Sequence, residues 1–121
     1  MQREHDKIRL LKYLNDALAA AEEIHIDTIG LEPKIYYFNN IKWIVERGIE
    51  IISEALRRAN KIDETLAEKI TDLPKIFATR NKIAHEYDIV DPLQLYNIVV
   101  KNIPLLIKEL KILIDHLQQE S

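Results

Sequence analysis

The chain contains no cysteine, which excludes disulfides, thiolate nucleophiles and cysteine zinc sites. Its 121 residues include only two glycines and four prolines, so few positions interrupt helices. It has no apolar run long enough to span a bilayer, and its first residues resemble no secretory signal. We therefore expect a cytoplasmic protein without a membrane segment.

The chain also lacks an excess of basic residues. Lysine and arginine total 17 against 20 aspartates and glutamates, which gives a formal net charge of −3. General nucleic-acid-binding domains are usually basic, so any contact with RNA must use a local patch. Two basic clusters are candidates: Arg57, Arg58 and Lys61, and the N-terminal series Arg3, Lys7, Arg9 and Lys12. The simpler interpretation of each is a solvated helix face with ion pairs, such as Glu54 with Arg57 or Arg58.

Apolar residues recur at steps of three and four along the chain, and this spacing predicts an all-α protein. A loop is expected over residues 25–33, and a short helical turn over residues 63–69. The main helices are expected over residues 2–23 and 34–61, after Asp72, and from residue 91 to 118. The length fits one domain over residues 1–121, folded as an antiparallel four-helix bundle with an extra short helical turn.

Aspartates mark three of the expected helix starts. Asp63, Asp72 and Asp91 each precede an apolar periodic segment, as N-capping residues do. Pro104 should bend the last helix, because proline removes one hydrogen bond from a helix interior.

The helix expected over residues 34–61 has an unusually wide apolar surface. Gly48 lies within its apolar stripe, where a glycine costs helix stability and indicates a close approach of another helix. Trp43 falls among polar residues, and we interpret it first as part of a subunit interface. Peripheral packing and base stacking are the alternatives. The extra apolar width predicts a homodimer.

The most informative segment is Arg80-Asn81-Lys82-Ile83-Ala84-His85-Glu86-Tyr87. Arginine presents a planar fork of donors that matches phosphate oxygens. Histidine exchanges protons near neutral pH, and the tyrosine adds a hydroxyl that can be modified. This combination is suited to phosphate chemistry.

Helical geometry separates the two main candidate groups of this segment. At about 100° per residue, Arg80 and His85 would lie about 140° apart around a continuous helix, too far to share one face. Either the helix loosens near His85, or two subunits bring their segments together. The two solutions are compatible.

The order of residues in this segment resembles the signature of the HEPN superfamily. That signature is an arginine, four residues of which the first is polar, a histidine, any residue and a tyrosine. The chain is most similar to its HepT-like branch. The segment Ile52-Ser53-Glu54-Ala55 is similar to a further family pattern. The resemblance implies a helical homodimer that acts as the toxin of a toxin–antitoxin pair, with a minimal nucleotidyltransferase of the MntA type as antitoxin.

The resemblance also implies an activity, that of an endoribonuclease that needs no metal or cofactor. In this reaction the ribose 2′-hydroxyl of the RNA would attack the adjacent phosphate and leave a 2′,3′-cyclic phosphate. His85 would be the general acid or base, Arg80 would stabilise negative charge on the phosphate, and Asn81 would orient the imidazole or the phosphate. Tyr87 would accept AMP from the nucleotidyltransferase, which would block the cleft.

Other interpretations of the same residues stay open. Arg80 could pair with Glu86 or Asp88, and His85 could satisfy a carbonyl at a helix end, although neither explains the whole cluster. The chain could also be a non-catalytic subunit that binds substrate or nucleotide for a nucleotidyltransferase. A plain helical scaffold has only the composition in its favour.

Overall fold

The chain folds entirely into helices over the residues that the computed structural model describes, which are 2–85 and 91–120. The elements, in chain order, are α1 (Gln2–Thr28), the 3₁₀ helix η1 (Pro33–Tyr37), α2 (Asn39–Ile62), α3 (Leu66–Lys69), α4 (Leu73–Ala84), α5 (Pro92–Asn97), the π-helical η2 (Ile98–Asn102) and α6 (Ile103–Gln119). The predicted all-α bundle with an extra short helical turn is confirmed, and α3 is that turn.

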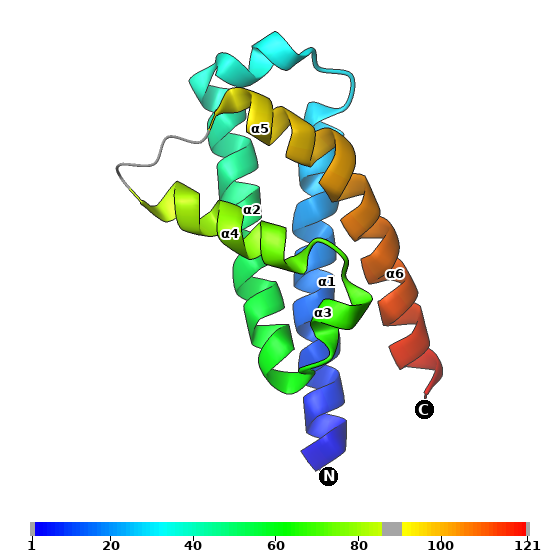
Figure 1. The fold of residues 1–121 in the computed structure, drawn as a ribbon. Coiled ribbons are helices and arrows are strands. Elements are labelled where there is room, and N and C mark those ends of the chain that lie inside the picture. The colour runs from blue at the N-terminus through cyan, green and yellow to red at the C-terminus, as the bar shows by residue number, and fades with distance from the viewer. Residues whose placement is uncertain (1, 86–90, 121) are drawn as a thin grey trace.

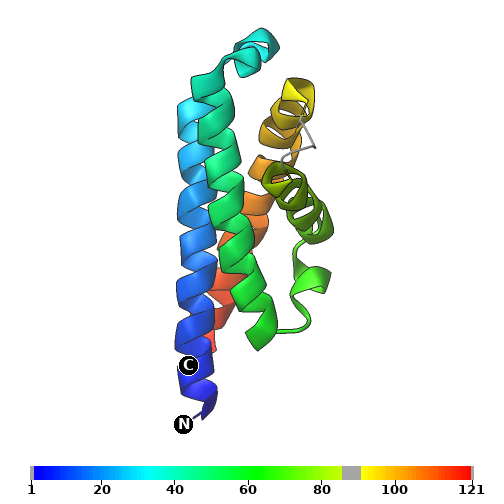
Figure 2. The same ribbon diagram turned by 90° about the vertical axis from the view of Figure 1, so that its left-hand side faces the viewer.

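Two long antiparallel helices, α1 and α2, form the frame of the bundle (Figure 1). The α6 helix packs against α1 and runs antiparallel to it. The α4 helix packs on α2 and lies across it, on the same side of the α1–α2 pair as α5 (Figures 1 and 2). The opposite side of the α1–α2 pair carries no other helix of the described chain.

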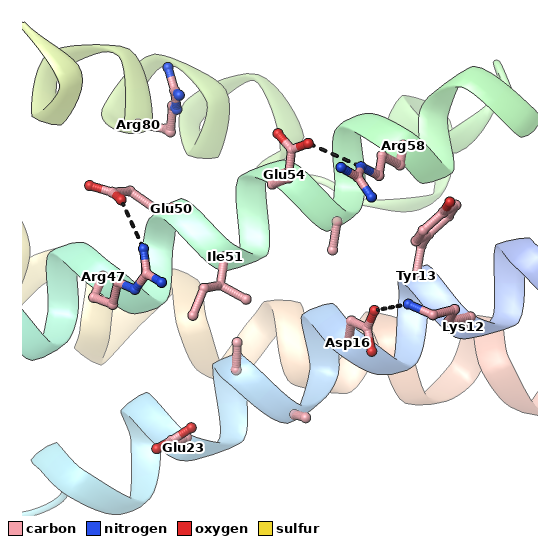
Figure 3. Close-up of a pocket in the computed structure, with 13 residues that line it drawn as sticks. Lys12, Tyr13, Asp16, Glu23, Arg47, Glu50, Ile51, Glu54, Arg58 and Arg80 are labelled. Atoms are coloured by element: carbon pink, nitrogen blue, oxygen red, sulfur yellow. Dashed lines mark hydrogen bonds and ion pairs between the residues drawn. The ribbon is translucent and has the colours of Figure 1, made fainter.

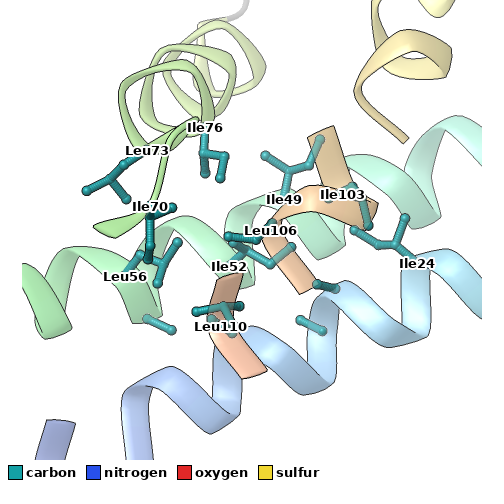
Figure 4. Packing of buried hydrophobic residues seen from close by; sticks show 14 of the residues in the cluster. Ile24, Ile49, Ile52, Leu56, Ile70, Leu73, Ile76, Ile103, Leu106 and Leu110 are labelled. Atoms are coloured by element: carbon teal, nitrogen blue, oxygen red, sulfur yellow. The ribbon is translucent and has the colours of Figure 1, made fainter. Parts of the chain in front are cut away.

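Buried aliphatic side chains hold these elements together (Figure 4). Ile52 and Leu56 of α2 lie near Leu106 and Leu110 of α6, and Ile24 of α1 lies near Ile103 of α6. Each of these residues is at most 2% exposed. Full burial of one such side chain contributes about 1.5–3 kcal/mol. The predicted stripe on α2 is largely confirmed, since its members from Val45 to Ala59 are buried, whereas Phe38 is 60% exposed.

The close packing of α1 on α2 depends on Gly48. A Cβ atom at this position would lie 2.5 Å from Cδ1 and 2.6 Å from Cγ1 of Ile24. Both distances are shorter than any normal contact between carbon atoms. The close helix approach predicted at Gly48 is therefore confirmed.

The predicted boundaries of the first two helices are wrong. The first helix continues through the expected loop to Thr28, whose buried hydroxyl donates to the Ile24 carbonyl at 2.6 Å. The chain then turns at Gly30, which has a φ of 79°. The second predicted helix is divided into η1 and α2, because Phe38 adopts extended backbone angles between them.

At the start of α1, the apolar side chain of Ile8 is 66% exposed. Figure 1 shows the reason, because the N-terminal turns of α1 extend past the end of α2. No neighbouring helix is there to cover them within the described chain.

One of the three predicted aspartate caps is confirmed, because the side chain of Asp91 accepts from the Leu93 amide at 2.9 Å. Asp63 accepts from the Thr65 amide at 3.0 Å, but Thr65 is the N-cap of α3 and no side chain caps that helix. Asp72 does precede α4, but its side chain caps no amide of that helix. Instead it accepts from Nδ2 of Asn102 in η2 at 2.8 Å, and so links α4 to the last helical rod.

The last predicted helix is a continuous rod of three segments, α5, η2 and α6. The Ile103 amide donates to the carbonyl of Ile98, five residues back, which is the π-helical pattern. Pro104, which has no amide hydrogen, follows directly. The rod changes direction there, as predicted (Figure 1).

Candidate active site

The α4 helix carries the arginine–histidine segment and is fixed on the core by a buried face. Leu73 and Ile76 are buried, at 2% and 6% exposure, where α4 packs on α2. Arg80 is half-buried, whereas Asn81 and His85 are exposed. The helix therefore holds the arginine firmly and leaves the amide and the imidazole accessible.

The helix ends between Ala84 and His85. His85 has extended backbone angles, φ −87° and ψ 122°, and its amide donates to the Lys82 carbonyl at 3.2 Å. The rigid 140° separation from Arg80 therefore does not apply, because His85 is no longer part of the helix. This confirms the first predicted solution, a helix that loosens near the histidine. Tyr87, the predicted acceptor of AMP, lies outside the described residues, as do Glu86 and Asp88.

Arg80 lies at the edge of a groove that runs between α1 and α2 (Figure 3). Two carboxylates of α2, Glu50 and Glu54, line the same groove. Glu50 forms an ion pair with Arg47 at 3.7 Å, and Glu54 forms one with Arg58 at 3.0 Å. Within residues 2–85 and 91–120, Arg80 itself makes no hydrogen bond or ion pair with a side chain.

The chain can now be compared with known proteins. The family model described as "Ribonuclease HepT-like" matches residues 39–113, from the start of α2 into α6. The chain belongs to the HepT-like ribonuclease family. The matched range contains Arg80, Asn81, His85 and Tyr87.

Among curated proteins, this HepT-like chain is similar to one of Methanocaldococcus jannaschii with the name "Putative RNase MJ1380". The two are 30% identical over 103 residues, which cover 83% of this chain and 92% of the relative. No solved structure matches the chain significantly.

The groove between α1 and α2 has a volume of about 610 Å³ and is balanced in charge. Its charged lining residues are the cations Lys12, Arg47, Arg58 and Arg80 and the carboxylates Asp16, Glu23, Glu50 and Glu54. Three of the cations have partners in the groove, since Lys12 also pairs with Asp16 at 2.9 Å. This HepT-like chain therefore presents a largely neutralised surface beside Arg80.

The two basic clusters noted in the sequence take part in this neutralisation. Lys12 and Arg58 come from different clusters but lie over the same ring, with Nζ 5.3 Å and Cζ 6.0 Å from the centroid of Tyr13. The predicted ion pair of Glu54 is confirmed with Arg58. Glu54 and Arg58 are four residues apart in the sequence, which is a spacing that favours an ion pair on a helix.

Exposed apolar side chains accompany the groove on α2. Trp43 is 66% exposed and Ile51 is 41% exposed. Trp43, Arg47, Glu50 and Glu54 follow one another at steps of three and four, so they share one face of the helix. Peripheral packing does not account for a tryptophan this exposed.

Of the other aromatic residues, Tyr36 and Tyr96 form an edge-to-face pair with centroids 5.3 Å apart. Burial raises the pKa of Tyr36, whose ring is 1% exposed. Tyr36 is therefore part of the core, whereas Tyr37 is 60% exposed.

Two further observations concern the described ranges alone. No helix there combines the length and the apolar character needed to cross a membrane. Those ranges also contain no group of three or more histidine, aspartate or glutamate side chains placed to share a metal ion.

Proposed function

We propose that the protein is a metal-independent endoribonuclease in which Arg80 and His85 act on one phosphodiester. The observation that carries the proposal is the end of α4, where a half-buried arginine without a described partner precedes an exposed histidine just past the helix end. Membership of the HepT-like ribonuclease family supports it. The name of the archaeal relative is consistent with it.

The reaction follows from what the two side chains can do. A base removes the proton of the ribose 2′-hydroxyl, whose oxygen forms a bond to the adjacent phosphorus. The bond from phosphorus to the 5′ oxygen then breaks, and an acid protonates that oxygen. The products are a 2′,3′-cyclic phosphate and a 5′-hydroxyl. An imidazole can serve as base or as acid, a role worth typically about 10²- to 10⁴-fold in rate.

Arg80 and Asn81 have supporting roles in this proposal. The guanidinium stabilises the charge that builds on the non-bridging oxygens, through charge-assisted hydrogen bonds. Asn81 is exposed on the last turns of α4, four residues before His85. Its amide orients the imidazole or the phosphate.

We further propose that two chains form the active unit, with α2 and the neighbouring groove as the interface. The uncovered side of the α1–α2 pair, the neutralised charges and the exposed Trp43 and Ile51 support this surface. A twofold axis across it would make the contact isologous and bring two Arg80 side chains toward each other. Two imidazoles could then share the acid and base roles.

In the full proposal the protein is a toxin, and a nucleotidyltransferase antitoxin transfers AMP to Tyr87. The support is the resemblance to the HepT-like branch and the position of Tyr87, two residues after His85. A phosphate attached there would bring negative charge to the site where the RNA phosphate must bind.

The test is cleavage of a labelled RNA in EDTA by the wild type, Arg80→Ala and His85→Ala. Arg3→Ala and His116→Ala are matched controls, because each removes the same side chain from an exposed position elsewhere. We expect cleavage by the wild type and both controls, and a loss of about 100-fold or more in the two site variants.

Two results would overturn the catalytic assignment. One is an inactive wild type, and the other is equal cleavage by all five proteins. The favoured function would then be the alternative, a non-catalytic subunit that binds substrate or nucleotide for a nucleotidyltransferase.

A further inference from the structure

A second groove lies on the other flank of α4, between this helix and α5. Its volume is about 240 Å³. The residues that line it are Lys75, Ala78, Thr79 and Lys82 of α4, Gln94 and Asn97 of α5, and Ile98. Lys75 and Lys82 are seven residues apart, so they lie on one line along the helix, about 10 Å apart in axial rise. We call this the lysine groove.

The lysine groove differs in charge from the groove beside α2. Among the described residues, its lining has two ammonium groups and two carboxamides but no carboxylate, whereas the groove between α1 and α2 contains four cations and four carboxylates. Neither lysine takes part in an ion pair with any residue that the structure describes. The chain as a whole has a net charge of −3, so a positive groove on it is a local feature.

Two aspartates near the lysine groove are already engaged by other partners. Asp72 accepts from Asn102 at 2.8 Å, and Asp91 accepts from the Leu93 amide at 2.9 Å. Each carboxylate thus accepts a hydrogen bond that stabilises the fold. Neither of these two carboxylates is paired with Lys75 or Lys82.

The lysine groove leads toward the proposed catalytic histidine. The carbonyl of Lys82 accepts the hydrogen bond of the His85 amide at 3.2 Å. A strand that follows α4 from Lys75 would pass Lys82 before it reaches the end of the helix. Arg80 projects from a different side of α4, toward the other groove.

We propose that the lysine groove binds the backbone of the RNA strand that leads to the cleaved phosphodiester. This inference rests on the proposed ribonuclease function. Lys75 and Lys82 would each neutralise one phosphate, and Gln94 and Asn97 would donate to phosphate or ribose oxygens. Because such contacts do not read bases, the lysine groove provides affinity and register without sequence preference.

The experiment compares Lys75→Gln/Lys82→Gln with Lys101→Gln/Lys108→Gln, in the whole chain. All four lysines are exposed, and both double variants change the net charge by the same amount. For a single-stranded RNA, kcat and KM are measured at several salt concentrations. Binding of the same RNA to His85→Ala protein, with and without each lysine pair, gives the salt dependence of affinity. Circular dichroism and thermal unfolding check that both variants are folded.

We expect loss of the lysine groove to raise KM and Kd about 10-fold or more near 0.1 M salt, with kcat unchanged. The slope of log K against log salt should become shallower by about 1.4, since each single-strand phosphate contact contributes about 0.7. The control pair should change neither quantity more than about twofold. Lys75→Glu/Lys82→Glu should weaken binding further, because it reverses the charge.

The possible failures can be distinguished. If the wild type neither cuts nor binds RNA, both the proposed function and the proposed role of the lysine groove are overturned. If the wild type cuts RNA and the two lysine pairs behave alike, the lysine groove alone is overturned. A lower kcat with unchanged KM would also overturn it, since that result is not expected of a binding surface.

Discussion

Ile24 of α1 occupies the space that any side chain larger than a hydrogen atom would need at position 48 of α2. The atoms Cδ1 and Cγ1 of Ile24 lie within 2.6 Å of where a Cβ of residue 48 would stand. Ile24 is 1% exposed, so it has little room to move aside. The contact between the two long helices therefore depends on this pair.

The Gly48→Ala variant should be less stable than the wild type. Alanine gains about 1 kcal/mol in helix propensity, but overpacking in a tight core costs about 1–3 kcal/mol. We expect a net loss of about 1 kcal/mol in the free energy of unfolding, measured in urea. In the Ile24→Ala background the same substitution should instead be neutral or stabilising, because the clashing atoms are gone. Equal effects in both backgrounds would contradict the close contact.

The stability of the protein should depend on pH through Asp63. Burial would raise the pKa of this carboxyl, but hydrogen bonds from Lys69 and Thr65 outweigh it, and the pKa is lowered from 3.8. A carboxyl with a lowered pKa stabilises the folded state above its unfolded pKa, and that contribution is lost as the pH falls through the folded value. Asp63→Asn should therefore cost about 1 kcal/mol at pH 7.

The cost of Asp63→Asn should shrink as the pH falls below the unfolded pKa of the carboxyl and vanish below its lowered folded pKa. Urea unfolding of both proteins between pH 7 and the lowest pH at which they fold measures it. Asp16→Asn is the control, since that carboxylate is half-exposed in its pair with Lys12. A cost for Asp63→Asn that does not change with pH would exclude the proposed linkage.

The proposed interface predicts that charge on the face of α2 produces monomers. Ile51→Asp should shift the sedimentation mass from twice the 14.2 kDa of one chain toward a single chain. Ile112→Asp on α6 is the matched control, because Ile112 is 48% exposed and Ile51 41%. If the wild type sediments as one chain, or if only the control dissociates, the interface lies elsewhere or does not form.

Local sequence patterns predicted most of the fold. The period of apolar residues gave the helices, because each one buries a single face, and the aspartate at position 91 marked a true helix start. The end of α1 was missed because Gly30 and Pro33 indicated a loop, whereas burial of Ile24 and Thr28 keeps the last turns helical. Tertiary packing outweighed the local signal there.

The candidate site was predicted only in part. The motif located Arg80, Asn81 and His85 on and just beyond one helix, and the end of that helix was one of two solutions considered. The position of α4 relative to α5, which forms the lysine groove, could not be predicted. It brings Lys75 and Lys82 beside Gln94 and Asn97, and no periodic pattern within one helix reports a contact between two helices.

The positions of the two candidate catalytic groups are determined by different parts of the chain, which meet between Ala84 and His85. The position of Arg80 is set by the core, through the buried Leu73 and Ile76 on the same helix. His85 stands on the chain beyond that helix, together with Tyr87. A group attached to this chain, or a protein bound to it, could displace the histidine and leave the arginine and the core unchanged. Inhibition of such a site would cost the fold no stability, and removal of the inhibitor would restore activity without refolding.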